Sequence, residues 1–386
     1  MESGASRRIA QPGPYTEARG ATHVEASTKT IPTTAASCGE GTNSRLAPAV
    51  DCVVTGATGL VGNNVVRLLL NRGRSVRTVV RPHRVADDPA LAGLPIETAS
   101  GTLADEQALQ QAIDGSSFVI HSAAMVHCGW RHRDEMHGVN VRGTELVARC
   151  ARRAGARLIH VSSVDAIGLR HDGAPADEDT PPGVMPECPY VVTKREAEEA
   201  VLREVDRGLD AVIVNPVFML GPWDWKPSSG RMLVEVASGK GLFAPPGGND
   251  FVDVRDVAAG ILAAMDRGHT GRRYILGGHP LSYFDAWKLF ARVGGRIQPL
   301  GTVGPVVLRM AGWCGDLAGL LARREPAVNS AAVTMSMLPH HFSCTRAKHE
   351  LGYTFRPLED TVQDAWEWFV GHGYVKPVRE RTVLVR

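Results

Sequence analysis

Three glycines spaced three residues apart follow directly on a run of β-branched residues in this sequence. Residues 50–55 (VDCVVT) predict a buried strand, and residues 63–72 have the apolar periodicity of a helix. Glycines between a strand and a helix allow a tight turn, close approach of the backbone to a pyrophosphate and close helix–strand packing. The segment therefore predicts a dinucleotide-binding turn, with contacts from Gly56, Thr58, Gly59, Leu60, Val61 and Gly62.

Short β-branched runs alternate with helical segments through the rest of the chain. We predict further strands at 75–80, 118–122, 157–162 and 211–215, and further helices at 140–154, 190–206, 254–267 and 281–293. Strands that alternate with helices of ten or more residues indicate an α/β fold with a doubly wound parallel sheet of the Rossmann type. Turn-rich segments after residue 216 predict a smaller C-terminal substrate-binding region.

The predicted organisation has four parts. Residues 1–46 are rich in Ala, Thr, Ser, Gly and Pro without apolar periodicity, which predicts a disordered N-terminal tail. Residues 47–216 form the dinucleotide-binding part. Residues 217–375 form mainly the substrate-binding region, with some segments returning to the Rossmann sheet, and residues 376–386 form a C-terminal tail.

Composition excludes several classes of protein. The 43 basic and 41 acidic residues give a net charge of +2 and are scattered, so a nucleic-acid partner is not expected. The seven cysteines contain no C-x-x-C pair, which argues against disulfides and structural zinc and favours a cytoplasmic, reducing location. The group His127, Cys128, His132 and His137 lacks helical ligand spacing, so we predict no metal site.

The end of the predicted second strand bears on the choice of cofactor. An Asp or Glu at this place usually binds the ribose 2′-hydroxyl of NAD. The sequence instead has Arg81, whose guanidinium would pair with the 2′-phosphate of NADP(H). NADP(H) is therefore favoured, and NAD(H) stays open because a surface arginine can also end a strand without binding anything.

Tyr190 and Lys194 lie four residues apart in a predicted helix, so their side chains share one face. An ammonium near a phenol favours the phenolate, so we expect the pKa of Tyr190 to fall toward neutrality. Such a tyrosine can exchange a proton with a carbonyl or hydroxyl oxygen while a hydride is transferred. Ser162 or Ser163, at the carboxyl end of the strand at 157–162, is the candidate to bind that oxygen.

Together these motifs resemble the extended short-chain dehydrogenase/reductases of the NAD-dependent epimerase/dehydratase family, over about residues 50–369. Within this family, the sequence most resembles the dihydroflavonol reductases and the 3β-hydroxysteroid dehydrogenases. The resemblance rests on the following segments: Thr55-Gly56-x-x-Gly59-x-x-Gly62, His121-Ser122-Ala123-Ala124, Asn140-Val141-Arg142-Gly143-Thr144, Ser162-Ser163, Tyr190-x-x-x-Lys194, Asn215-Pro216, Phe251-Val252-Asp253-Val254-Arg255-Asp256-Val257 and Ser343-Cys344-Thr345-Arg346-Ala347-Lys348-x-x-Leu351-Gly352-Tyr353.

The resemblance assigns roles to several residues. It implies that Ser163, rather than Ser162, is the catalytic serine, and that Ala123, Ala124 and Pro216 line the cofactor site. Where the family often has Gly-Asp-Leu, this chain has Gly101-Thr102-Leu103, so Leu103 packs against the adenine without the usual aspartate. The resemblance also allows a homodimer, because two family helices often form a dimeric four-helix bundle.

We therefore predict an oxidoreductase that transfers hydride between NADP(H) and a carbonyl or hydroxyl group of a small substrate, with Tyr190 as general acid and base. One alternative is a nucleotide-sugar epimerase or dehydratase with tightly held NAD. Residues 164–168 lack the acidic Thr-Asp-Glu signature of the dehydratases. A second alternative is a non-catalytic NADP-binding sensor or scaffold.

The most apolar stretch of the chain is 303–322, which Arg309 and Asp316 interrupt. We interpret it as a core helix or as a lid over a lipophilic substrate, and as a poor transmembrane span. Peripheral contact with a membrane through the same stretch is the alternative. With Phe218, Met219, Trp223 and Trp225, it predicts a hydrophobic substrate.

Overall fold

A parallel sheet of seven strands forms the centre of the fold, in the order β10-β6-β5-β4-β1-β2-β3. The computed structural model describes residues 49–82, 88–183 and 185–375, and the expected tails lie outside these ranges. The strands of this sheet are β1 (Val50–Thr55), β2 (Val76–Val80), β3 (Glu97–Ser100), β4 (Ser116–His121), β5 (Arg157–Val161), β6 (Ala211–Pro216) and β10 (Arg273–Leu276).

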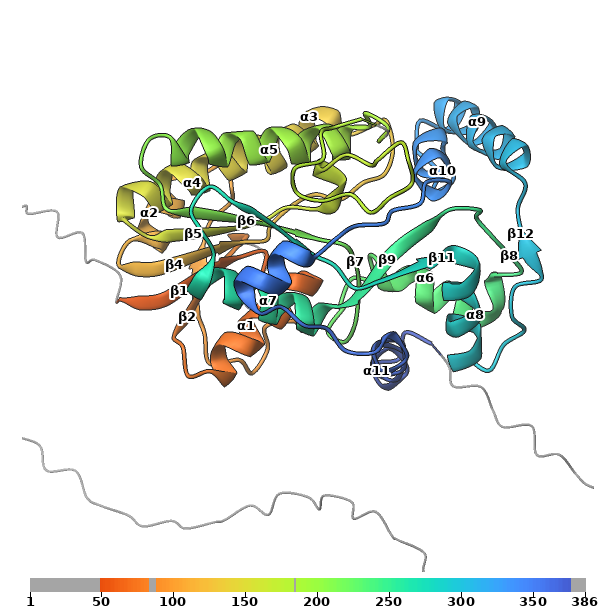
Figure 1. Ribbon diagram of the computed structural model, residues 1–386. Helices are drawn as coiled ribbons and strands as arrows, with labels where there is room; N and C mark the ends of the chain where they lie inside the picture. Colours follow the sequence, from red (N-terminus) through yellow and green to blue (C-terminus); the bar gives the residue numbers. More distant parts are fainter. Residues whose placement is uncertain (1–48, 83–87, 184, 376–386) are drawn as a thin grey trace, which may run out of the picture. The chain divides into compact units, whose positions relative to one another are not determined.

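Helices cover both faces of this sheet, which confirms the predicted doubly wound α/β class. Figure 1 shows α2, α4 and α5 on one face and α1 and α7 on the other. Their bounds are α1 (Leu60–Asn71), α2 (Glu106–Ile113), α4 (Gly143–Ala154), α5 (Pro189–Val205) and α7 (Val254–Arg267); α3 (Arg133–Met136) and the π-helical turn η2 (His137–Arg142) lead into α4, and the 3₁₀ turn η3 (Val164–Ala166) follows β5.

The order of the strands reverses beside β1. The chain runs from β1 to β2 and β3 in one direction, then crosses to β4 on the other side of β1. Thr55 pairs with His121 at the carboxyl ends of β1 and β4, so the loops that follow these two strands diverge from one point. Ligands of doubly wound proteins bind in the crevice at such a switch point.

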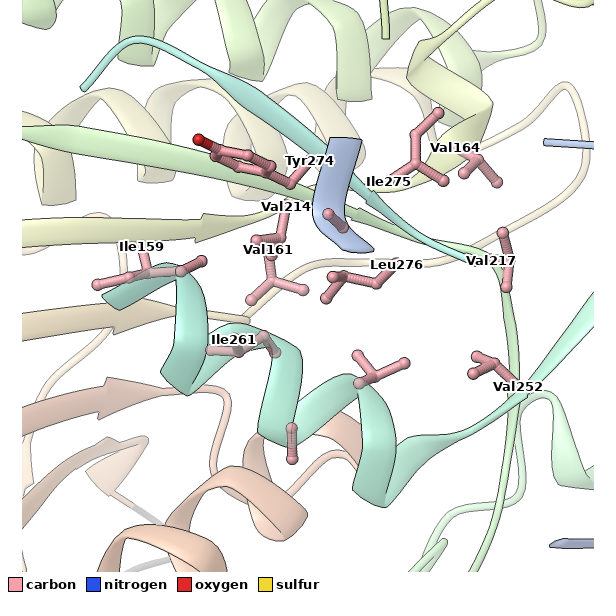
Figure 2. Close-up of a cluster of buried hydrophobic side chains, with 14 of the residues drawn as sticks. Ile159, Val161, Val164, Val214, Val217, Val252, Ile261, Tyr274, Ile275 and Leu276 are labelled. Atoms are coloured by element: carbon pink, nitrogen blue, oxygen red, sulfur yellow. The ribbon is translucent and has the colours of Figure 1, made fainter. Parts of the chain in front are cut away.

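A buried apolar core holds α7 against the sheet. Figure 2 shows Ile159 and Val161 of β5 above Ile261 of α7, with Leu276 of β10 beside them. These side chains are buried because helices cover both faces of the sheet. Strands in such a sheet therefore have continuous apolar sequences. The strand β10, which is far along the chain, thus returns to the same sheet and pairs with β6.

The second part of the chain forms smaller sheets with their own helices and core. One sheet has the order β11-β9-β7 and the other pairs β12 with β8. The elements are β7 (Phe218–Leu220), α6 (Gly230–Glu235), η4 (Val236–Lys240), β8 (Phe243–Ala244), β9 (Gly248–Asp253), β11 (His279–Ser282), α8 (Tyr283–Val293), β12 (Gly301–Thr302), α9 (Pro305–Ala322), α10 (Ser330–Ser336), η5 (Ala347–Leu351) and α11 (Leu358–Gly371).

The interpretation of 303–322 as a core helix is wrong. This stretch does form one helix, α9, but only 11% of it is buried, and its length and mean hydropathy of 1.2 would suit a membrane span. Gly312 and Gly319 are its buried residues. The apolar composition of the stretch did not reveal that its small residues, rather than its large ones, face the protein.

Candidate active site

The glycine turn lies against the loop that follows β4. Gly56 has a φ of +75°, and a Cβ there would come within 2.6 Å of the backbone nitrogen of Ala123. A Cβ on Gly62 would overlap the backbone of Gly56 and come within 2.8 Å of the Ser122 hydroxyl. Both glycines are therefore needed for this turn to close: L side chains disfavour the φ of Gly56, and neither position has space for a Cβ.

The amino end of α1 is open to an anion. Gly59 is the N-cap residue and offers no side chain to the free N–H groups, and the first turn of α1 contains no acidic residue. Asn63 braces the turn from below, donating hydrogen bonds from Nδ2 to the carbonyl oxygens of Ala57 (3.2 Å) and Ala90 (2.6 Å). Unpaired N–H groups at a helix start attract phosphate, so the turn fits the pyrophosphate of a dinucleotide.

The other residues predicted to bind cofactor lie around this turn. Thr58, Val61, Ala123 and Ala124 are half-buried and Leu60 is buried, whereas Arg81 is exposed at the end of β2. Leu103 packs against Gly143, where a Cβ would lie within 2.9 Å of the Leu103 Cβ. Pro216 is buried at the end of β6. Their contacts with a dinucleotide stay predictions.

Ser163 lies at the carboxyl end of β5, where it begins the turn η3. Its Oγ donates a hydrogen bond to Asp165 Oδ2 (3.1 Å) and accepts one from the Asp165 backbone N–H (3.2 Å). The buried Oγ of the competing candidate Ser162 has no hydrogen-bond partner among the described residues. Ser163 also hydrogen bonds with Tyr190, and its catalytic role stays a prediction.

Tyr190 and Lys194 lie on the first turns of α5 and are both buried. Pro189 at the start of the helix fixes its direction. The Lys194 Nζ donates a hydrogen bond to the carbonyl oxygen of Val161 (3.3 Å), which places the ammonium beneath the carboxyl end of β5. The structure therefore brings the predicted serine, tyrosine and lysine to one edge of the sheet.

The pKa of Tyr190 moves against the expectation from sequence. Burial raises this pKa above its usual value, and the negative charge of Asp165 raises it further, while a hydrogen bond with Ser163 opposes the rise. Burial lowers the pKa of Lys194 to about 8, against the opposing effects of Glu198 and Asp165. The expected fall is absent because desolvation of the phenol and the charge of Asp165 outweigh the hydrogen bond with Ser163.

Two residues that the sequence argument did not assign hold these groups in place. Asn215 Nδ2 donates hydrogen bonds to the Ser163 backbone oxygen (2.9 Å) and to Glu198 Oε1 (2.6 Å). The buried Glu198 also accepts a hydrogen bond from Arg273 Nε on β10 (2.6 Å). The motif Asn215-Pro216 was a signal for the first residue, but nothing local in the sequence connects it with Glu198.

The aromatic residues expected to face a substrate have another role. Trp223 and Trp225 pack against Trp368 of α11, with ring centroids 6.2 and 5.3 Å away. The guanidinium of Arg67 lies 3.4 Å from the centroid of the Trp223 ring. Phe218 meets Phe251 edge to face. These rings join the second part of the chain to α1 and α11, so they do not carry the argument for an apolar substrate.

A doubly wound sheet with a glycine turn at its switch point, and a Ser–Tyr–Lys group at the carboxyl end of the nearby strand β5, is typical of dinucleotide-dependent enzymes. The model of the NAD dependent epimerase/dehydratase family matches residues 52–277. The chain belongs to this family, within the extended short-chain dehydrogenase/reductases, and is an NAD(P)-dependent oxidoreductase.

Three relatives are similar over most of their length. Sterol demethylase protein B of Methylococcus capsulatus is 35% identical over 84% of this chain and 99% of its own. A putative dihydroflavonol 4-reductase of Synechocystis is 36% identical over 84% of this chain and 96% of its own. The crystal structure of the protein gox2253 matches with a TM-score of 0.74 and 37% identity, covering 84% of this chain and 99% of that one.

Proposed function

We propose that the protein reversibly reduces a carbonyl group of an apolar substrate to a hydroxyl, with NADP(H) as the dissociable hydride carrier. The observation that carries this proposal is the position of Ser163, Tyr190 and Lys194 at the carboxyl ends of the strands, beside the glycine turn. A nicotinamide dinucleotide, when bound, supplies or accepts the hydride.

Tyr190 keeps its proton in this site because burial and Asp165 raise its pKa. A protonated phenol is the form that donates a proton to a carbonyl oxygen, as reduction requires. Ser163 lies beside the phenol and hydrogen bonds to the same oxygen, stabilising its developing charge. Lys194, cationic below about pH 8, stabilises the phenolate that is left after proton transfer.

The preference for NADP(H) rests on Arg81. It lies exposed at the carboxyl end of β2, where a carboxylate would select NAD, and makes no hydrogen bond with the described residues. Its guanidinium is free to pair with a 2′-phosphate. The family description names NAD, so NAD(H) is the alternative cofactor.

The apolar nature of the substrate is supported by the names of two relatives, a sterol demethylase protein and a dihydroflavonol 4-reductase. Both names refer to compounds with fused rings that carry oxygen substituents. Burial already removes water from the phenol of Tyr190, which suits a substrate of this kind.

Paired titrations with NADPH and NADH, followed by a panel of apolar ketones, test this proposal. Tyr190→Phe is expected to lower kcat by a factor of about 10² to 10⁴ and to leave cofactor binding unchanged. Tyr274→Phe is the matched control, since this buried tyrosine on β10 bonds to Glu350 and lies outside the site. Full activity of Tyr190→Phe would remove Tyr190 from the mechanism.

The cofactor preference has its own pair of variants. Arg81→Ala is expected to weaken NADPH binding about 10- to 100-fold, the loss of a charge-assisted contact, and to leave NADH binding unchanged. Arg74→Ala, which removes a pair with Asp51 near the opposite end of β2, should affect neither. Tight, non-exchanging NAD with turnover of nucleotide-sugars would instead establish the epimerase, and cofactor binding without any turnover would establish the scaffold.

A further inference from the structure

The helix α9 presents its large apolar side chains to the outside. In Figure 1 it lies at the periphery, with α10 beside it. Seven residues of this outer face are each at least 57% exposed: Val306, Val307, Met310, Trp313, Leu317, Leu320 and Leu321. At about 100° per residue they fall within an arc of roughly 140°. We call these seven residues the outer face of α9.

The opposite side of α9 carries three glycines. A Cβ on Gly312 would come within 3.1 Å of the Ser330 Cα, and one on Gly319 within 2.8 Å of the Pro326 Cδ. A Cβ on Gly315 would overlap the carbonyl oxygen of Val328. The segment 326–330 therefore packs directly on the backbone of α9. The large apolar residues point away from the protein. A helix on the surface of a water-soluble protein has the reverse arrangement, with its apolar side toward the core.

The charges on this helix and directly after it are mostly positive, because Arg323 and Arg324 follow its last residue. Between residues 303 and 324 the chain has three arginines, all exposed, at positions 309, 323 and 324. The one acidic residue there, Asp316, is half-buried and accepts a hydrogen bond from the Ser330 backbone N–H (3.1 Å). A wide apolar face bordered by free cations fits the boundary between the headgroups and acyl chains of an anionic lipid bilayer.

The geometry favours a helix that lies on the bilayer over one that crosses it. Eighteen helical residues span about 27 Å, slightly less than the hydrocarbon core. The glycine side is already packed against the protein, so only one side of α9 is available to lipid. A helix of this kind is buried along one face to a shallow depth.

The hairpin of α9 and α10 is attached to the loop that follows β4. Glu325 accepts hydrogen bonds from His127 Nε2 (2.6 Å) and from the backbone N–H groups of Trp130 (2.7 Å) and Arg131 (3.1 Å). Asn329 Nδ2 donates to the Cys128 carbonyl oxygen (3.0 Å). In the same loop, the Met125 backbone N–H donates to Asn140 Oδ1 (2.7 Å), and Asn140 Nδ2 donates to Thr193 Oγ1 (3.2 Å) on α5. The outer face is thus carried by a segment fixed to the rim of the candidate active site.

We propose that α9 docks the protein onto an anionic membrane surface, with its outer face among the lipids and its arginines at the headgroups. The docking would place the rim formed by residues 126–131 beside the bilayer. Val126 and Trp130 of this rim are 61% and 47% exposed and extend the apolar surface toward the site. The inference goes beyond the proposed function, because it rests on α9 and not on the catalytic residues.

Co-sedimentation with vesicles tests the docking. The full chain is expected to bind vesicles of phosphatidylcholine and phosphatidylglycerol in equal parts, and to bind them less as salt is raised. Leu317→Glu/Leu321→Glu should lower the partition coefficient about tenfold or more, because it places two charges among the acyl chains. Gln107→Glu/Gln111→Glu on the exposed side of α2 adds the same net charge and spacing, and should bind like the wild type.

Several results would overturn the proposal. These are equal binding of both double variants, no binding of the wild type, or binding to pure phosphatidylcholine vesicles that salt does not weaken. Light scattering without lipid tests the alternative that a second copy of the chain covers the outer face. A dimer that only Leu317→Glu/Leu321→Glu converts to a monomer would establish this alternative. Reduction of a water-soluble ketone without vesicles should be unchanged in this variant. Failure of the proposed enzymatic function can therefore be distinguished from failure of the proposed membrane docking.

Discussion

The hydroxyl of Ser163 and the carboxylate of Asp165 form a closed pair, in which Ser163 Oγ donates to Oδ2 (3.1 Å) and accepts from the Asp165 N–H (3.2 Å). The same carboxylate raises the pKa of both Tyr190 and Lys194. Asp165 therefore acts on all three residues of the proposed catalytic group, although the sequence argument had no role for it. Its charge keeps the phenol protonated and the ammonium cationic.

Asp165→Asn isolates the effect of this charge. The amide oxygen can still accept the hydrogen bond from Ser163, while the negative charge is lost. The pKa values of Tyr190 and Lys194 should both fall, and the alkaline decline of kcat/KM should move down by about one pH unit. Asp172→Asn, an exposed residue paired with Arg170, is the control and should leave the profile in place. An unmoved profile in Asp165→Asn would contradict this role.

The pKa of Lys194 predicts the pH dependence of the wild type. Burial lowers it to about 8, so the ammonium is charged below this pH and neutral above it. If the cation supports the reaction, kcat/KM for reduction is flat below pH 8 and falls about tenfold per unit above it. Lys194→Arg should keep whatever activity it has constant through this range, and a decline at the same pH in this variant would exclude the lysine as its cause.

The contribution of Lys194 to folding stability changes with pH in the opposite direction to kcat/KM. The unfolded lysine keeps its proton up to a pH of about 10.4 and the folded one only to about 8. Between these values the unfolded state binds more protons, so this residue's contribution to stability rises with pH. Urea unfolding of the wild type and of Lys194→Met at pH 8 and pH 10 should show this rise in the wild type alone.

Gly62→Ala tests the closure of the phosphate turn. The added methyl group would overlap the backbone of Gly56, so the turn must open. We expect dinucleotide affinity to fall at least about tenfold and stability to fall by about 1–3 kcal/mol. Gly371→Ala in α11 has nothing within 4 Å and a helical backbone, and it should be neutral or stabilising. Unchanged cofactor affinity in Gly62→Ala would show that the turn does not hold the dinucleotide.

Asp250 on β9 predicts a pH-dependent stability that is independent of the site. Burial raises its pKa to about 7, although the Gly278 N–H and Lys348 oppose the rise. The folded state thus binds more protons than the unfolded state between about pH 4 and pH 7, and stability falls as the pH rises through this window. Asp250→Asn should gain about 2 kcal/mol relative to the wild type between pH 5 and pH 8, measured by urea unfolding. Equal shifts in both proteins would refute the assignment.

The sequence predicted correctly the bounds of elements that are marked by a β-branched run or by a helix-capping residue. The strand β1 and the helix α7 have the predicted bounds, because β-branched runs and the Asp253 cap mark their ends. The helix α1 begins three residues before the predicted start, directly after Gly59. The strand β3, with the sequence ETAS, was missed because an exposed edge strand has no apolar run.

Relationships between distant residues were beyond the sequence argument. The motifs brought Ser163, Tyr190 and Lys194 to one edge, but the raised pKa of Tyr190 depends on burial, which spacing does not report. In α9 a signal was present and not used: glycines at 312, 315 and 319 mark a side that packs on backbone. Reading those glycines together would have predicted that the large apolar residues face outward.

The hydrogen bonds of Glu198 have a consequence for the modularity of the protein. Its buried carboxylate is shared between Asn215 of β6 and Arg273 of β10, whereas the predicted dinucleotide-binding part ends at residue 216. A fragment cut there would leave the buried carboxylate of Glu198 without its arginine beneath α5, which is expected to destabilise the fragment. The dinucleotide-binding part is therefore not expected to fold as an independent domain. A fragment used in another protein would have to extend through β10, and folding during synthesis is expected to finish only after β10 has been made.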